Sequence, residues 1–448
     1  MKPRYERPVI VRHAVGGISK FGPSTGLRTM SSFEGVPVAQ LVEKYGSPLF
    51  VFSERLLRDR FRELRDQLAR RFADFTIAWS YKTNYLSGVC RVFHQEGAWA
   101  EVVSGMEMRK ALALGIPGRQ ILFNGPGKSD ADLDIAFREG VQVHLDHLDE
   151  LTLAERVADR LSVTPEVGIR VSLSELPVPH WDRFGFNLES GRALEAARRI
   201  QRGGRLDLRA LHSHIGTFIQ DPDAYRMLAR GMGRFAQQLD LELGIRIDTI
   251  DLGGGFASHN TLQSQYLPGE ESTPSIGQYV ERIAMGFEEA YDGAVPPRVV
   301  FETGRAMVDD AAILISSVVG NKRLVDGRRA VILDAGVNIL PTAWWYRHAI
   351  HPAQEVYGTV EPTVFFGPLC MNIDVVRDRI MFPPLKAGDR VVIGHVGAYN
   401  VTQWMQFITE RPNVVMVSAK GETALLRRAE GLEAMMALEE MPPWLATS

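Results

Sequence analysis

Short apolar runs alternate with helical patterns over much of the chain, and this rhythm limits the possible folds more than any other feature. Eight such runs occur, from FTIAWSYK at 75–82 to PRVVFETGR at 297–305. The segments between them, such as LDELTLAERVADRL at 148–161, carry apolar residues at the spacing of a helix with one buried face. Eight strands alternating with helices over about 250 residues are typical of a (β/α)8 barrel. The sequence therefore predicts an α/β fold whose main domain is a TIM-like (β/α)8 barrel.

The rhythm changes near residue 306, after which apolar runs follow one another without long helices between them. Examples are RAVILDAG at 329–336 and DRVVIGHVGAY at 389–399, which predict a β-rich C-terminal domain. The run SPLFVF at 47–52 also reads as a strand, while residues 1–30 suit either a mobile arm or an added strand. We therefore expect three parts, which are an N-terminal arm with a strand that joins the β domain at 1–52, the barrel at 53–306, and the β-rich C-terminal domain at 307–448.

Charge and apolar content exclude several kinds of partner. The 448 residues carry a formal net charge of −3 with both signs interspersed, so neither nucleic acid nor a membrane surface is expected as a partner. No apolar run reaches the length of about 18 residues that a membrane span needs, and the N-terminus lacks the apolar core of a signal peptide. The two cysteines, Cys90 and Cys370, fit a reducing cytoplasm better than a disulfide framework. We therefore expect a cytoplasmic protein.

Polar and charged residues gather where the predicted barrel strands end. In barrels of this kind the loops after the strand ends carry the chemistry. Lys82 ends the first predicted strand, where a charge beside a buried run needs a partner or a task. The residues in comparable positions are Ser104, Glu107, Asn124, Arg170, His212, His214, Gly216, Thr217, Gly253, Gly254, Gly255, Glu302, Gly304 and Arg305. Together they predict one active site at this end of the barrel.

Two of these groups suit an anion such as phosphate. The glycines at 253–255 leave backbone N–H groups open to close approach, and the loops after the last two strands are the usual phosphate seat of such barrels. Thr217, expected at the start of the next helix, adds a hydroxyl and the positive end of a helix dipole. A tight turn explains the glycines equally well, and the spacing does not match a dinucleotide-binding motif.

The other groups suit a pyridine ring that carries an aldehyde. A lysine such as Lys82 forms a Schiff base with an aldehyde, and a carboxylate such as Glu302 keeps a ring nitrogen protonated. The imidazole of His214 can stack on the ring face. Taken singly, these residues also suit a surface lysine, an ion pair of Glu302 with Arg305 and a structural histidine. Their combination on one rim favours pyridoxal phosphate. His212 and His214 alone are too few for a metal hydrolase, and no metal is expected.

Six spaced motifs resemble a known family. They are YKTN (81–84), HSHIGT (212–217), DLGGG (251–255), ETGR (302–305), GPLCMNID (367–374) and GAYN (397–400). In this order they are similar to the pyridoxal-phosphate decarboxylases of fold type III, which include diaminopimelate decarboxylase and the eukaryotic-type ornithine decarboxylases. The resemblance extends over about residues 35 to 420. It implies an amino-acid decarboxylase, a carboxy-lyase that uses pyridoxal 5'-phosphate.

The resemblance also implies a role for each matching residue. Lys82 forms the Schiff base with the cofactor, His214 stacks on its ring, and Glu302 pairs with its ring nitrogen. The phosphate is held by Thr217, Gly254, Gly255, Gly304, Arg305 and Tyr399. Cys370 returns a proton to the substrate carbon after carbon dioxide leaves, and in the family this cysteine comes from the partner subunit, which implies a homodimer. Expected substrate contacts are Arg170, Arg183, Tyr346 and Asp374.

Two departures from the family bear on the substrate. Diaminopimelate decarboxylase carries an arginine in the segment after D-x-G-x-N, where this chain has Pro341 and Thr342. The acidic residue expected after the cysteine is replaced by Met371. These changes remove a clamp for a distal carboxylate and a partner for a distal ammonium. They predict a substrate whose far end is modified, such as an amide conjugate or a carrier-protein-tethered amino acid. GAYNVTQWMQF (397–407) likewise resembles decarboxylases of siderophore or antibiotic biosynthesis.

Three alternatives stay open. One is diaminopimelate decarboxylase of lysine biosynthesis, and another is a racemase-type enzyme with the same cofactor. The third is a non-enzymatic module that binds the cofactor or a carrier protein. Glu302 argues against racemisation, because the related racemase places an arginine against the ring nitrogen. Cys370 and Glu302 together argue against a module without catalysis.

Overall fold

The computed structural model describes residues 28–445, which divide into two compact units. The barrel unit comprises Leu56–His259 and Ser272–Val308. The β-rich unit comprises the described residues up to Arg55, the segment Asn260–Glu271 and the residues from Asp309 onwards. Most of the arm expected at residues 1–30 lies outside the described part of the chain.

Eight parallel strands close into a barrel, which confirms the predicted fold class. Neighbouring strands pair in chain order, and the ring closes because β12 pairs with β4 while β10 pairs with β8. A short ninth strand, β9 (Phe186–Asn187), extends β8. The barrel strands are β4 (Phe75–Ser80), β5 (Trp99–Val102), β6 (Ile121–Phe123), β7 (Gln142–Leu145), β8 (Glu166–Ser172), β10 (Asp207–His212), β11 (Thr249–Asp251) and β12 (Arg298–Phe301).

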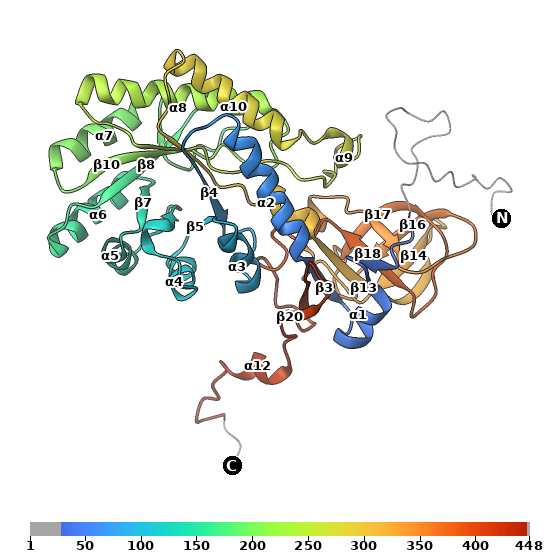
Figure 1. The fold of residues 1–448 in the computed structure, drawn as a ribbon. Coiled ribbons are helices and arrows are strands. Elements are labelled where there is room, and N and C mark those ends of the chain that lie inside the picture. The colour runs from blue at the N-terminus through green and yellow to red at the C-terminus, as the bar shows by residue number, and fades with distance from the viewer. Residues whose placement is uncertain (1–27, 446–448) are drawn as a thin grey trace. The chain divides into compact units, whose positions relative to one another are not determined.

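Helices follow the strands and surround the barrel (Figure 1). They are α2 (Glu54–Ala69), α3 (Ser87–Gln95), α4 (Gly105–Ala113), α5 (Asp130–Glu139), α6 (Leu148–Leu161), α7 (Arg192–Gly203), α8 (Pro222–Leu243), α10 (Ile276–Tyr291) and the short α11 (Arg305–Val308). A single-turn 3-10 helix, Gly118–Gln120, precedes β6. Among the described residues we find no helix with the length and apolar character that crossing a lipid bilayer requires.

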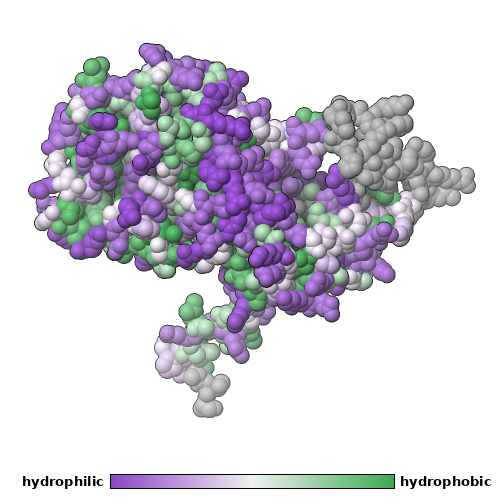
Figure 2. All heavy atoms as spheres, in the orientation of Figure 1, coloured by the Kyte–Doolittle hydropathy of each residue, from purple (hydrophilic) through white to green (hydrophobic). Residues whose placement is uncertain are grey.

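The helix α2 shows how the sequence pattern becomes a buried face. Its buried side chains are Leu57, Phe61, Leu64 and Leu68, which recur every three or four residues and therefore share one side of the helix. The arginines and acids between them face outward, and the surface over α2 is hydrophilic in Figure 2. The helix α2 is thus amphipathic, with one apolar face buried and its charged face in solvent.

A cluster of aromatic side chains packs against the loop at residues 253–255, which follows β11 and contains three glycines. Tyr225 on α8 and Tyr279 on α10 both contact Phe256, whose ring lies 4.2 Å from that of Tyr279, centroid to centroid, in a stacked arrangement. The Tyr225 hydroxyl donates a hydrogen bond of 2.8 Å to the carbonyl of Gly254. All three aromatic side chains are buried, so the loop after β11 is held from below by a rigid cluster.

The second unit is built on one mixed sheet. Its main order is β17-β16-β14-β13-β3-β19-β20, with β18 pairing β13 and β15. The N-terminal strand β3 lies between β13, to which it is antiparallel, and β19, to which it is parallel. The strands are β3 (Leu49–Ser53), β13 (Ala312–Arg323), β14 (Arg329–Leu333), β15 (Ile350–Pro352), β16 (Glu361–Phe366), β17 (Val375–Phe382), β18 (Arg390–Gly394), β19 (Asn413–Val417) and β20 (Thr423–Arg427).

Shorter elements complete the described chain. They are the hairpin β1 (Ser32–Phe33) and β2 (Val36–Pro37), the helices α1 (Val38–Tyr45), α9 (Gly269–Ser272) and α12 (Leu432–Met436), and the 3-10 turns Asp309–Ala311 and Pro341–Trp344. Helix α1 packs through Val38 and Leu41 on a core that includes Val51, Ile315 and Val415. The β-rich unit therefore has a hydrophobic core of its own.

The segment Asn260–Glu271 groups with the β-rich unit, although it lies within the range expected for the barrel. Its backbone pairs there, because the N–H of Gln263 donates to the carbonyl of Trp345 at 2.9 Å and Leu262 forms a β-bridge with Tyr346. These hydrogen bonds join residues far apart in sequence, and local sequence patterns do not report such pairings.

Candidate active site

Lys82 lies in the turn after β4 and pairs with a buried acid. Its Nζ donates to Oε2 of Glu101 on β5 at 2.7 Å, and the Glu101 side chain is fully buried. The Ser80 hydroxyl donates to the same oxygen at 2.5 Å. The charge of a lysine beside a buried strand is thus offset by a carboxylate from the next strand. About a third of the Lys82 side chain, 32%, stays exposed.

Glu302 follows β12, accepts a hydrogen bond from an amide and lies beside an imidazole. The Nδ2 of Asn124 donates to Oε1 of Glu302 at 2.5 Å, and the same nitrogen donates to Oε1 of Glu101 at 3.1 Å. The Nε2 of His212 lies 3.5 Å from Oε2 of Glu302. Glu302 and Glu101 are both buried, so a hydrogen-bonded chain runs inside the barrel from Lys82 to Glu302.

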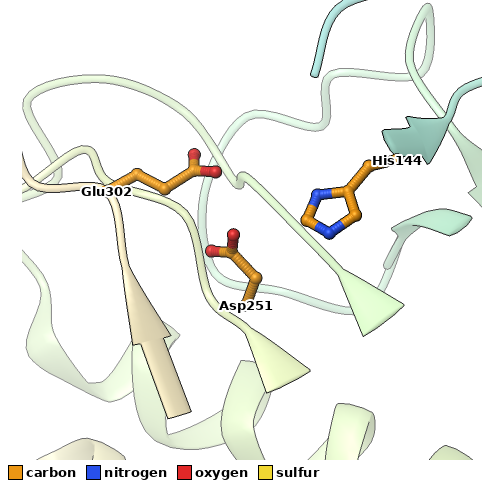
Figure 3. A group of neighbouring side chains, drawn as sticks. All are labelled: His144, Asp251 and Glu302. Atoms are coloured by element: carbon orange, nitrogen blue, oxygen red, sulfur yellow. The ribbon is translucent and has the colours of Figure 1, made fainter. Parts of the chain in front are cut away.

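A second carboxyl group lies beside Glu302. One carboxylate oxygen each of Asp251 and Glu302 and one imidazole nitrogen of His144 all lie within 4.8 Å of one another. The three side chains converge in Figure 3. Burial, followed by the nearby charge of Glu302, raises the pKa of Asp251 well above its usual value. Two carboxyl groups this close in a dry interior do not both ionise readily. Burial and the neighbouring Glu302 therefore keep Asp251 neutral.

Two histidines inside the barrel form a stacked pair. The rings of His144 on β7 and His212 on β10 are 5.1 Å apart, centroid to centroid, and nearly parallel at 14°. Burial lowers the pKa of each ring well below its usual value. A Cβ on Gly168 would meet Cδ2 of His144 at 2.4 Å, so a glycine at this point of β8 makes room for the pair. Both rings are neutral here.

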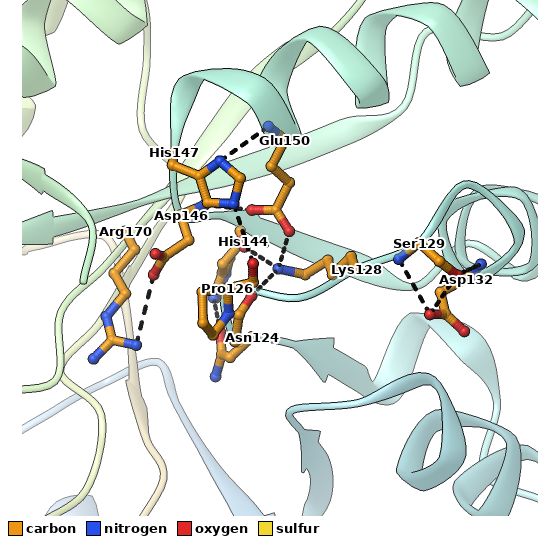
Figure 4. A network of polar contacts seen from close by, with 11 residues as sticks. Asn124, Pro126, Lys128, Ser129, Asp132, His144, Asp146, His147, Glu150 and Arg170 are labelled. Atoms are coloured by element: carbon orange, nitrogen blue, oxygen red, sulfur yellow. Dashed lines mark hydrogen bonds and ion pairs between the residues drawn. The ribbon is translucent and has the colours of Figure 1, made fainter. Parts of the chain in front are cut away.

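A buried lysine holds the loops under this pair. The Nζ of Lys128 donates to the carbonyls of Gly125 and His144 at 2.6 and 2.8 Å and to Oε1 of Glu150 at 2.9 Å (Figure 4). Glu150 uses its other oxygen to accept from the backbone N–H of Asp146. These contacts tie the loop after β6 to the loop after β7, and so they set the positions of Asn124 and His144.

His214 and the glycine loop form the next part of the site. The N–H of Gly254 donates to Nδ1 of His214 at 3.1 Å, so this imidazole is neutral at Nδ1, and removal from bulk water lowers its pKa well below the usual value. A Cβ on Gly254 would meet the carbonyl oxygen of Glu302 at 2.3 Å. A Cβ on Gly255, with φ of +103°, would meet the carbonyl oxygen of Gly216 at 2.4 Å. Only glycine lets these strand-end loops approach so closely.

Thr217, Gly304 and Arg305 lie around the same loops. Thr217 is exposed in a loop, and the prediction that it opens the next helix was wrong, because α8 begins only at Pro222, with Asp221 as its cap. Arg305 is buried at the start of α11, with its guanidinium 5.8 Å from the ring centre of Phe218. A Cβ on Gly304 would meet Oγ1 of Thr83 at 2.2 Å.

Arg170 and Arg183 contact one aromatic ring. The guanidinium of Arg170 lies 4.3 Å from the ring centre of Phe184, and that of Arg183 lies 4.7 Å from it. Arg170 is buried and its guanidinium is 3.8 Å from Asp146, whereas Arg183 is exposed. Burial lowers the pKa of Arg170 from its usual value.

The remaining expected residues belong to the β-rich unit. Cys370 is exposed, and Asp374 is buried with its oxygens accepting from the backbone N–H groups of Val337 at 2.8 Å and Leu369 at 2.7 Å. Burial raises the pKa of Asp374. The carboxyl of Asp374 thus holds the loop that carries Cys370. Tyr346 is buried, and Tyr399 has a left-handed backbone with φ of +62°.

Comparisons with known proteins identify the family. The family described as pyridoxal-dependent decarboxylase, pyridoxal binding domain, matches residues 55–309, which is more than half of the chain. This chain is a member of the pyridoxal-dependent decarboxylases. Diaminopimelate decarboxylase of Zymomonas mobilis is 28% identical over 428 residues, 92% of this chain and 97% of that protein. The enzyme of the same name from Actinosynnema pretiosum is 31% identical over 406 residues, 88% of this chain and 89% of its own length.

A solved structure agrees with this assignment. The crystal structure of diaminopimelate decarboxylase from M. jannaschii superposes with a TM-score of 0.85 at 26% identity, covering 94% of this chain and 98% of that chain. The prediction of a fold type III decarboxylase that uses pyridoxal phosphate is therefore confirmed. The resemblance to siderophore or antibiotic enzymes stays a prediction.

The barrel unit of this decarboxylase suits its cofactor. Lys82 presents an amine held by Glu101, and Glu302 presents a buried carboxylate. The backbone around Gly254 and Gly255 leaves no room for a Cβ, which is the form of loop that lets backbone N–H groups approach a phosphate. Lysine, carboxylate, neutral imidazole and glycine loop all lie at the carboxyl ends of barrel strands, the functional end of such folds.

Several residues in the site had no role in the sequence analysis. Glu101, His144 and Asp251 were not singled out, and Asn124 was noted only for its position. Glu101 and His144 did carry a signal, because each is a polar residue inside an apolar run, AWAEVV and VQVHL. A buried polar residue in a strand requires a partner, but the sequence does not show which one.

Proposed function

We propose that this decarboxylase acts on meso-diaminopimelate, and that the chain from Lys82 through Glu101 and Asn124 to Glu302 is the core of its catalytic site. That hydrogen-bonded chain is the observation that carries the proposal, because it places an amine and a buried carboxylate in one network. The choice of substrate is supported by relatives named diaminopimelate decarboxylase that align over most of both chains. A cytoplasmic location is part of the proposal.

The protein groups have separable tasks in this proposal. When bound, pyridoxal phosphate supplies an aldehyde that reacts with amines and a ring that withdraws electrons from the carbon losing its carboxylate. Lys82 would hold the cofactor through its aldehyde group, and Glu101 orients the lysine amine. Glu302 would accept a hydrogen bond from the ring N–H, and the neighbouring Asp251 is kept neutral by its burial. His214, neutral and fixed by the Gly254 N–H, covers one face of the ring.

The phosphate and the proton donor complete the assignment. Thr217, Gly254, Gly255, Gly304, Arg305 and Tyr399 are proposed to hold the phosphate. Cys370 is proposed to return a proton to the substrate carbon from the partner subunit of a homodimer, and its exposure is compatible with such a role. Arg170, Arg183, Tyr346 and Asp374 are proposed substrate contacts, with Asp374 acting through the loop it holds.

A second candidate substrate is an amino acid whose far end is an amide conjugate or a carrier-protein tether. Pro341 and Thr342 are buried, and the Thr342 hydroxyl is engaged with Asn400 at 2.7 Å and His348 at 2.9 Å. The position that carries an arginine in diaminopimelate decarboxylase therefore offers no charge here, and neither does Met371. These observations favour a substrate without a free carboxylate at its distal end.

One assay separates the candidates. Purified protein loaded with pyridoxal phosphate is incubated with meso-diaminopimelate, ornithine, lysine and amide conjugates of diamino acids, and carbon dioxide release is followed. Turnover of meso-diaminopimelate at least about tenfold above the conjugates supports the first candidate, and the reverse order supports the second. If the compounds exchange their α-hydrogen and none of them releases carbon dioxide, the racemase-type alternative is supported. That result would contradict both candidate substrates.

A separate experiment tests the lysine. Borohydride reduction of the loaded enzyme, followed by proteolysis and mass spectrometry, should find the cofactor on Lys82. Cofactor attached to another lysine, or to none, would overturn the assignment of the site.

A further inference from the structure

Asn124 stands at the centre of the polar network, between the two carboxylates. It lies directly after β6 and is only 3% exposed. Its Nδ2 donates to Glu101 at 3.1 Å and to Glu302 at 2.5 Å, and its Oδ1 lies 2.7 Å from Nδ1 of His144. The amide nitrogen has two hydrogens, so one can be directed to each carboxylate.

These contacts determine the orientation of the amide and the tautomer of the histidine. Carboxylates only accept hydrogen bonds, so the amide nitrogen must face Glu101 and Glu302. The amide oxygen then faces His144, whose Nδ1 must carry a hydrogen. The buried His144 is neutral, and it therefore holds Asn124 from the side opposite the carboxylates.

The two carboxylates belong to opposite ends of the proposed cofactor site. Glu101 pairs with Lys82, the amine that takes the aldehyde, and Glu302 faces the ring nitrogen in the proposed function. Charge-assisted hydrogen bonds strengthen when the acceptor is ionised and weaken when it is protonated. A change of charge at one carboxylate therefore shifts the amide toward the other.

We propose that Asn124 is a positioning residue that couples the two ends of the cofactor site, so that the charge on Glu302 sets the strength of the Lys82–Glu101 pair. This inference rests on the proposed roles of Lys82 and Glu302. Loss of the charge on Glu302 lets Asn124 donate fully to Glu101, which weakens the hold of Glu101 on the ammonium form of Lys82. The amine then becomes reactive at lower pH.

The test uses the full-length protein without cofactor and pyridoxal phosphate as the probe. The rate at which the protein captures pyridoxal phosphate is followed by absorbance across pH, and the midpoint of the profile is compared in four proteins. These are wild type, Glu302→Gln, Asn124→Ala and the double variant. We expect Glu302→Gln to lower the midpoint by about 0.5 to 1 pH unit in the wild-type background and by less than about 0.2 with Asn124→Ala. Equal shifts in both backgrounds would show coupling through space alone and overturn the proposal.

A second variant covers the case in which Asn124→Ala does not fold. Asn124→Asp keeps the shape and the oxygen that faces His144 but replaces the shared donor with an acceptor between two carboxylates. It should raise the midpoint by about 1 pH unit or more, and a midpoint within about 0.2 of wild type would overturn the proposal. The control is Asn321→Asp on β13, which removes an amide donor to the carbonyl of Leu385 and should leave the midpoint unchanged.

Failure of this inference is distinguishable from failure of the proposed function. Borohydride reduction of each variant reports whether the cofactor is attached to Lys82. If the cofactor is attached to Lys82 and Glu302→Gln shifts the pH midpoint equally in both backgrounds, only the role of Asn124 is rejected and the proposed site stands. Attachment elsewhere in the wild type rejects the proposed site, and the coupling with it.

Discussion

Two lysine–glutamate pairs in the barrel have similar geometry and different surroundings. Lys82 and Glu101 are 2.7 Å apart, and Lys128 and Glu150 are 2.9 Å apart. The side chain of Lys128 is fully buried, whereas that of Lys82 is 32% exposed. Lys128 directs its Nζ to three protein oxygens, which satisfies all three donors of an ammonium group.

The difference separates a structural pair from a reactive one. A fully bonded ammonium inside the protein has no position left for a ligand, and removing either partner leaves the other as an uncompensated buried charge. Lys82 has a buried acid on one side and an exposed surface on the other, so a small molecule can reach it. Side-chain accessibility, more than the length of the ion pair, distinguishes the two lysines, and four variants can break or sharpen this comparison.

The largest expected effect is the loss of activity in Lys82→Ala. Without the amine the cofactor has no covalent attachment, so carbon dioxide release should fall by about 10³-fold or more, measured as kcat/KM. The free energy of unfolding should fall by less than in Lys128→Met, because the buried Glu101 keeps its hydrogen bonds from Ser80 and Asn124 when the amine is gone. The exposed Lys386 provides the control, since Lys386→Ala should keep full activity. A Lys82→Ala enzyme that retains a tenth or more of the wild-type activity, about 10%, would contradict the comparison.

Lys128→Met should have the opposite profile. Its removal leaves the Glu150 carboxylate and two carbonyl groups without their buried donor, which should lower the free energy of unfolding by about 3–5 kcal/mol. Urea unfolding of the cofactor-free protein at neutral pH measures this loss. Adding Glu150→Gln to Lys128→Met should recover part of it, because the orphaned charge is then gone. A loss below about 1 kcal/mol would mean that the buried pair does not hold the two loops.

The sequence predicted the parts of this comparison that depend on local pattern. Alternating apolar runs revealed the eight strands, and the position of Lys82 at a strand end marked it as unusual. The position of Lys128 near a strand end was equally visible, but its burial follows from contacts with Glu150 on α6 and with the carbonyl of His144 on β7. No local pattern reports such contacts.

The wrong start of α8 and the missing role of Asn124 have different origins. The start of α8 was placed at Thr217, although Asp221 followed by Pro222 is a recognised helix-start signal. Asn124 was noted, but its bond to Glu302 joins residues 178 positions apart. Barrel closure brings β6 and β12 to the same interior, and the sequence does not show which of the inward side chains will meet.

A third buried acid in the barrel, Glu107, shows how burial alone changes the ionisation of a glutamate. Glu107 on α4 is buried, and this burial raises its pKa to about 7. Because the folded pKa exceeds the unfolded value near 4.5, its contribution to stability is fully present below that value and is lost as pH rises through about 7. Glu107→Gln removes this loss, so the variant should be more stable than wild type by about 3 kcal/mol at about pH 8 and similar at about pH 4.5.

Urea unfolding of both proteins across this range checks the prediction. The Gln side chain can still accept from the N–H of Val103, which donates to Glu107 at 2.8 Å, so this hydrogen bond is retained. Stability curves that run parallel at every pH would show that the pKa of Glu107 is the same in the folded and the unfolded protein.

Glu101→Gln gives the smallest and most specific effect. The Glu101 carboxylate favours the ammonium form of Lys82, so replacing it by a neutral amide should shift the pH midpoint of pyridoxal phosphate capture downward by about 1 unit. The matched control is Glu150→Gln, which changes the acid of the closed pair and should leave that midpoint within about 0.2 unit of wild type. Equal shifts in the two variants would mean that Lys82 responds to the general field of the barrel interior. In that case the pairing with Glu101 would not set the reactivity of Lys82, and the difference between the two pairs would be one of access alone.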